Sequence, residues 1–100
     1  MFRTIRFAYR GVQFERDPYK AASNLAKHEV GFESACEVFL DPFRRVVEAA
    51  FPDEVRDAAI GYTESQQLLT VVHLSIHEEV IRIISARRAS KEERRLYEQD

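Results

Sequence analysis

The sequence has few of the residues that bind a small protein together through disulfides or metal ions. Its 100 residues include one cysteine, three histidines and three glycines, the glycines being scattered at positions 11, 31 and 61. A lone cysteine excludes an intrachain disulfide and fits a reducing compartment; Cys36, among apolar neighbours, is expected to be an inert core thiol. The sequence contains no glycine-rich phosphate loop, HExxH motif or Cys/His ligand pair. No metal site and no cofactor are therefore expected.

Long apolar runs are also missing. No stretch approaches the ~18 apolar residues of a membrane span, and the first residues alternate charged with apolar side chains instead of forming the apolar segment of a signal peptide. Hydrophobic residues still make up 45% of the chain. A single domain of residues 1–100 could therefore bury about 60–68% of its unfolded surface without a covalent cross-link. We expect one cytoplasmic domain that does not bind membranes.

Charge is sorted along the chain, although the formal net charge is only −2. Residues 1–28 and 80–95 each carry six lysines or arginines and two acids, whereas residues 29–64 carry three and nine. The total argues against a protein that coats nucleic acid, but a compact anionic ligand responds to the local field. Two basic segments that meet in the fold would form a positive patch. The alternative is that they are solvated surfaces on unrelated faces.

Hydrophobic periodicity and helix-start signals organise the first half of the chain. Asp17 followed by Pro18 is a strong helix start, because the carboxylate can accept from unpaired backbone N–H groups and proline lacks a donor that would be unused there. The patterns predict, in order, a strand or extended arm, a short second strand, two helices and a third short helix: Phe2–Tyr9, Val12–Phe14, Pro18–His28, Phe32–Leu40 and Phe43–Ala50. Residues 51–53, which follow, could belong to a loop.

The second half is expected to contain strands and a final helix. Three strand-like runs are separated by short polar links, which favours an antiparallel meander, because parallel pairing needs a longer crossover. The predicted strands and helix are Val55–Tyr62, Gln67–Ile76, Glu79–Ala86 and Ser90–Gln99. The expected fold class is α+β: an antiparallel sheet made of this meander and an N-terminal strand or hairpin, packed with two or three helices and a C-terminal helix.

The central predicted strand carries a histidine that could lie beside an arginine of the last strand. Its core-like face consists of Leu68, Thr70, Val72, Leu74 and Ile76. His73 lies on the other face, and a two-residue turn at positions 77 and 78 would place it directly opposite Arg82. An imidazole beside a guanidinium would put a proton-transfer group next to a phosphate anchor, as RNA cleavage by the 2′-hydroxyl requires. A three-residue link would separate the two, leaving a half-buried histidine and a solvated arginine.

Basic residues also gather where the last strand and the first helix end. Arg87 and Arg88 precede a helix that Ser90 and Glu93 would start with a capping box. Consecutive guanidinium groups beside a helix N-terminus can bind phosphate. The pair at positions 27 and 28, a lysine and a histidine, ends the first helix, where the helix dipole alone would account for cations. These residues are therefore either phosphate ligands or ordinary helix-end and surface cations.

Several blocks of the sequence, in the right order over about residues 12–98, resemble the BrnT toxins. The most specific are D-P-Y-K-A-A-S-N-L-A-K-H, from Asp17 to His28, and I-R-I-I-S-A-R-R-A-S, from Ile81 to Ser90. Shorter matches lie at residues 31–35, 38–42, 59–61 and 71–73. The chain departs from the family at Arg16, where tryptophan is usual, at Glu29, where glycine is usual, and over residues 43–56.

The resemblance implies a RelE-like α+β fold and metal-independent endoribonuclease activity that inhibits translation and growth. It also implies a BrnA-like antitoxin with a ribbon-helix-helix fold that neutralises the toxin in a hetero-oligomer and alone contacts DNA. RelE-like toxins use mixed basic side chains on the sheet, not a fixed triad. The matching candidates are, for catalysis, Lys27, His28, His73 and Arg82, and, for RNA phosphate binding, Lys20, Arg87 and Arg88.

The alternative is a non-catalytic interaction module, whose basic face would only dock an acidic protein. A neighbouring gene for a small ribbon-helix-helix protein would favour the toxin, and an isolated gene would favour the module.

Overall fold

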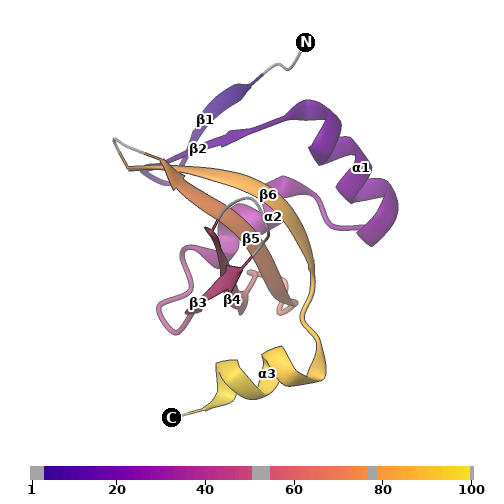
Figure 1. Cartoon of the computed structure of the whole chain (residues 1–100), viewed down its shortest axis with the longest axis vertical. Helices are drawn as coiled ribbons and strands as arrows, with labels where there is room; N and C mark the ends of the chain where they lie inside the picture. Colours follow the sequence, from indigo (N-terminus) through magenta and orange to yellow (C-terminus); the bar gives the residue numbers. More distant parts are fainter. Residues whose placement is uncertain (1–3, 51–54, 77–78, 100) are drawn as a thin grey trace.

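The computed structural model describes residues 4–50, 55–76 and 79–99. These residues form three helices and a six-stranded sheet (Figure 1). The elements are β1 (Ile5–Tyr9), β2 (Val12–Arg16), α1 (Pro18–His28), α2 (Phe32–Val38), β3 (Arg45–Ala50), β4 (Val55–Tyr62), β5 (Leu68–Ile76), β6 (Val80–Arg88) and α3 (Lys91–Glu98). The α+β fold expected from the sequence is confirmed, as are the N-terminal hairpin and the meander of β4, β5 and β6.

The strands lie in the order β1-β2-β6-β5-β4-β3. Every neighbouring pair is antiparallel except β2 and β6, which are parallel, with Phe14 opposite Ile81. The sheet is therefore mixed, not wholly antiparallel as expected. The long connection between β2 and β6 is what permits parallel pairing, because such strands need a crossover and cannot be joined by a tight turn.

The prediction of a short helix over Phe43–Ala50 is wrong, and the possible loop at residues 51–53 lies outside the described residues. Residues 45–50 form β3, which pairs antiparallel with β4 so that Arg45 lies opposite Ile60 and Val47 opposite Ala58. A helix here would bury its apolar stripe, yet Phe43 is 75% exposed. Pairing with β4 satisfies the backbone hydrogen bonds of this segment in another way, and tertiary pairing overrides a weak helical pattern.

The core lies between α2 and one face of the sheet. Its fully buried members come from β2, α2 and the meander, and include Phe14, Phe32, Cys36, Val38, Leu69, Val71 and Ile83. Burial raises the pKa of the Cys36 thiol to about 12, so the prediction of an inert core thiol agrees with its surroundings. Gly61 lets α2 approach β4, because a Cβ there would lie 2.9 Å from Val38 Cγ1.

The helix ends follow the sequence signals. Asp17 caps α1 by accepting from the Tyr19 N–H at 2.8 Å. Ser90 and Glu93 form the predicted capping box of α3. Glu29 ends α1 in the left-handed conformation, with φ of 59°. Glycine adopts this conformation without steric cost, which gives a physical reason for the glycine usual in BrnT toxins at this position.

Arg16 contacts two elements at the corner where the resemblance would place tryptophan. Its guanidinium lies over the Phe7 ring, 5.4 Å from the ring centroid. It also donates to the Glu33 carboxylate of α2 at 3.1 Å. An arginine can lie flat against an aromatic ring and bind a carboxylate at once. Arg16 therefore contacts both β1 and α2 at this corner.

Candidate functional site

Helix α1 is attached to β6 by one buried side chain. The Asn24 amide donates to the carbonyls of Val30 at 2.9 Å and Ala86 at 2.8 Å, and its oxygen accepts from the Ala86 N–H at 3.0 Å. The register of β2 on β6 extends only to Arg82. Asn24 therefore supplies hydrogen bonds to β6 where β2 has ended, and α1 lies alongside that strand (Figure 1).

A groove of ≈ 410 Å³ lies between α1 and β6. Lys20, Lys27 and His28 line it from the helix, and Ile84 and Ser85 line it from the strand. Residues three, four and seven apart share a helix face, so the side chains at 20, 27 and 28 project on the same side as Asn24. The structure thus brings three of the predicted site residues into one groove. We call this feature the α1–β6 groove.

Arg82 lies in an ion-pair network, not on an open solvated face. It donates to Glu15 at 2.7 Å, and Arg6 donates to the other oxygen of that carboxylate at 3.1 Å. The Glu15 side chain is only 5% exposed. Burial by itself would raise the pKa of Glu15, but hydrogen bonds from the two arginines outweigh it and lower the pKa. The network joins β1, β2 and β6, so removing Arg82 would test stability and RNA binding together.

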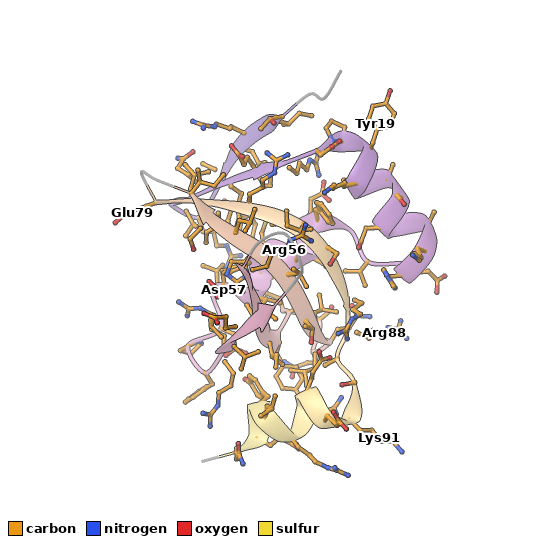
Figure 2. All side chains as sticks on the ribbon, in the orientation of Figure 1. Tyr19, Arg56, Asp57, Glu79, Arg88 and Lys91 are labelled. Atoms are coloured by element: carbon orange, nitrogen blue, oxygen red, sulfur yellow. The ribbon has the colours of Figure 1, made fainter. Side chains whose placement is uncertain are left out.

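The two arginines at the end of β6 differ in their surroundings. Arg87 makes two hydrogen bonds to the Glu93 carboxylate, at 2.7 and 2.8 Å. Arg88 is exposed, and its side chain extends outward from the end of β6 (Figure 2). Arg88 is therefore accessible to a phosphate as it stands, whereas Arg87 would share its guanidinium between Glu93 and a ligand.

The predicted pairing of His73 with Arg82 is wrong. His73 lies opposite Ile83, and Arg82 lies opposite Leu74. Ile76 pairs with Val80, so the link between the strands has three residues, and the register then shifts at Val72 and His73. Neighbouring residues of a strand point to opposite faces, so His73 and Arg82 project to opposite sides of the sheet.

His73 lies in the core. It is 4% exposed, its Nδ1 lies 3.2 Å from the Val71 carbonyl oxygen, and its ring meets Phe39 edge to face with 4.8 Å between centroids. Burial lowers the pKa of His73, despite the opposing effects of that carbonyl and of Asp57. The catalytic role of His73 stays a prediction, but the pairing with Arg82 on which it was based does not occur. The third histidine, His77, lies outside the described residues.

Two polar residues that position these groups were not identified from the sequence. Glu15 holds Arg82, and Asn24 holds α1 against β6. The available signal for Asn24 was its place in the middle of a helix, where asparagine is disfavoured unless its side chain has a partner. Glu15 gave no such signal, because its main partner is 67 residues away.

Among the described residues, no three His, Cys, Asp or Glu side chains come together in a group that could hold a metal ion. No helix in the described part of the chain is long and apolar enough to cross a membrane.

Glu93 should make stability depend on pH in acid. Two hydrogen bonds from Arg87 lower its pKa from an ordinary 4.5 to about 2. The ion pair therefore stabilises the fold above about pH 4.5, and this contribution is lost as pH falls from 4.5 towards 2. In urea unfolding, we expect Glu93→Gln to lower stability by about 1 kcal/mol at pH 7, because the pair is partly exposed.

The difference between Glu93→Gln and the parent should shrink at pH 3. Glu92→Gln, at an exposed neighbouring position, is the matched control and should match the parent throughout. Equal stability of the Glu93→Gln variant and the parent at pH 7 would show that the ion pair between Arg87 and Glu93 does not stabilise the fold.

Comparisons with known proteins agree with this architecture. A family model described as the ribonuclease toxin BrnT of type II toxin–antitoxin systems matches residues 17–93. The 1.1 Å crystal structure of the Brucella abortus ribonuclease toxin BrnT is similar, with a TM-score of 0.61 and 30% identity over 76% of this chain and 94% of that chain. The search of curated proteins gave no match. The chain therefore belongs to the BrnT family of ribonuclease toxins of type II toxin–antitoxin systems.

Proposed function

We propose that this protein is an endoribonuclease that cleaves RNA without a metal ion and uses the α1–β6 groove as its site. The observation that carries the proposal is the meeting of Lys20, Lys27 and His28 in that groove. Two ammonium groups supply the positive charge that an RNA backbone requires. The imidazole of His28 supplies a group that can both accept and donate a proton.

The proposed reaction is attack by a ribose 2′-hydroxyl on the adjacent phosphorus. Either His28 accepts the 2′-hydroxyl proton while water protonates the departing 5′-oxygen, or His28 donates its proton to that oxygen while water accepts the 2′-hydroxyl proton. Lys27 stabilises the added negative charge on the phosphate oxygens. The P–O5′ bond breaks as the P–O2′ bond forms. The products are a 2′,3′-cyclic phosphate and a 5′-hydroxyl. Arg88, which is exposed at the end of β6, and Arg87 would bind neighbouring phosphates.

We also propose that cleavage inhibits translation in the cytoplasm and that a BrnA-like antitoxin prevents it. A toxin of a type II system implies a protein antitoxin and an RNA substrate. The antitoxin proposed here has a ribbon-helix-helix fold and forms a hetero-oligomer with the toxin, and only the antitoxin contacts DNA. Its acidic side chains would meet the basic segment of residues 80–95 at an electrostatically steered rate.

The test combines growth, cleavage and chelation. The protein is expressed alone and together with the product of the neighbouring gene, and the purified protein is incubated with RNA with and without EDTA. We expect growth arrest only without the neighbour, cleavage unaffected by EDTA, and 2′,3′-cyclic phosphate ends.

Three results would count against parts of the proposal. Intact RNA at stoichiometric amounts of folded protein would favour the non-catalytic interaction module. If EDTA abolished cleavage and a divalent ion restored it, the reaction would depend on a metal ion, and the metal-independent mechanism would be wrong. A 3′-phosphate with no cyclic intermediate would exclude attack by the 2′-hydroxyl.

A further inference from the structure

Tyr19 presents an aromatic ring to solvent at one end of the α1–β6 groove. It lines the groove and is 75% exposed. In the described part of the chain, neither its ring nor its hydroxyl makes a ring contact or hydrogen bond. Figure 2 shows the side chain standing clear of the ribbon at the start of α1. A large apolar ring that does not pack against its own protein is available to a ligand.

The backbone beneath this ring is fixed. The Tyr19 N–H donates to the buried Asp17 carboxylate at 2.8 Å, and the preceding residue is Pro18, whose φ is restricted by its ring. Asn24 attaches the same helix to β6 one turn further on. The ring therefore projects from a rigid base. A rigid aromatic ring loses little conformational entropy when it binds, which favours its use as a contact.

The groove continues from Tyr19 along one face of α1 past Lys20 to Lys27 and His28. Lys27 lies eight positions after Tyr19, which is about 12 Å along the helix axis at a rise of 1.5 Å per residue. An exposed aromatic followed by a row of cations matches the two parts of a nucleotide chain, because bases stack on rings and phosphates bind ammonium groups. Bases inside a duplex present only their edges and cannot stack on a side chain.

We propose that Tyr19 is a base-stacking residue and that the α1–β6 groove selects single-stranded RNA. The inference rests on the proposed function, since it assigns a substrate form to the same groove. One unpaired base stacks on the Tyr19 ring while the following phosphates pass Lys20 and Lys27 towards His28. Tyr19 contributes binding and positioning and takes no part in proton transfer.

The test measures binding with an RNA that cannot be cleaved. A fluorescent oligonucleotide with 2′-O-methyl groups is titrated by anisotropy as a single strand and as a duplex of equal length. The parent should bind the single strand more tightly. Tyr19→Ala should weaken single-strand binding by about 5- to 150-fold, the effect of one stacked base. Tyr19→Phe keeps the ring and should bind like the parent, whereas Tyr19→Leu keeps apolar area only and should bind like the alanine variant.

Two comparisons separate stacking from other effects. Phe43 is also 75% exposed, lies beside Arg44 and Arg45, and is not in the groove. Phe43→Ala is the matched control and should bind like the parent. Lys27→Ala should reduce the slope of affinity against salt, whereas Tyr19→Ala should leave that slope unchanged, because stacking releases no counterions. All variants are first shown to melt like the parent.

The outcomes distinguish this inference from the proposed function. If the parent cleaves ordinary RNA but Tyr19→Ala binds as tightly as the parent, or duplex binds as well as single strand, only the stacking inference falls. The stacking inference is also overturned if Phe43→Ala loses as much single-strand affinity as Tyr19→Ala, or if Tyr19→Leu binds the single strand as tightly as the parent. A folded parent that neither binds nor cleaves RNA overturns both.

Discussion

Replacing His28 with glutamine is expected to lower the rate of RNA cleavage by roughly 10²- to 10⁴-fold, the usual contribution of a general acid or base. His28 lines the α1–β6 groove beside Lys27 and is only partly covered, so a bound phosphodiester can reach its ring. Glutamine has a similar size and can form hydrogen bonds, but its side chain cannot act as a general acid or base. The effect should appear in single-turnover cleavage at saturating enzyme.

His73→Gln is the informative comparison, because it tests the role predicted from the sequence. His73 is 4% exposed, and burial lowers its pKa. We expect this variant to retain cleavage in proportion to its folded fraction. His77→Gln completes the set, and each variant is melted before assay. If His73→Gln is inactive while folded and His28→Gln cleaves like the parent, then the buried histidine is the proton-transfer group and the groove is not the active site.

Replacing Asn24 with leucine should produce the largest loss of stability. The substitution leaves three backbone groups without their partner: the Val30 carbonyl and both the N–H and carbonyl of Ala86. Each buried polar group left unpaired costs about 1–3 kcal/mol, so the total should be about 3 kcal/mol or more. For a chain of this length, the melting temperature should fall by roughly 12 °C or more.

Two variants of α1 control this experiment. Ala26→Ser changes an exposed position of the same helix and should melt within about 2 °C of the parent. Asn24→Asp can accept from the Ala86 N–H but cannot donate to either carbonyl while ionised. Its burial beside carbonyl oxygens would raise the pKa of the new carboxyl, so stability should recover as pH falls. A melting temperature for Asn24→Leu close to that of the parent would show that α1 does not depend on this side chain.

Features set by local sequence were predicted well, and features set by distant residues were not. Asp17 and Pro18 start α1, and Ser90 starts α3, because caps act within one helical turn. The parallel pairing of β2 with β6 could not be read from either strand, since it depends on where a long connection returns. His73 lies opposite Ile83 because the link after Ile76 has three residues, one more than the two-residue turn that would have paired it with Arg82.

The candidate site shows the same division. Lys20, Lys27 and His28, all candidates from the sequence, do line one groove, because helical spacing fixes which side chains align. Nothing in the sequence indicated an acidic partner for Arg82, yet Glu15 binds it from another strand. A strand pairing across the whole fold creates that contact. Catalytic roles for all these residues stay predictions until the variants are assayed.

The position of β6 in the sheet has a consequence for when the protein becomes active during its synthesis. β6 lies between β2 and β5, although it is the last strand to be made. It also supplies Ile84 and Ser85, one wall of the groove. A nascent chain that has not yet reached Val80 therefore lacks both the strand that joins the two halves of the sheet and that wall. Since domains fold as the chain emerges from its N-terminus, we expect the ribosome to synthesise β6 before the proposed groove can form and cleave RNA.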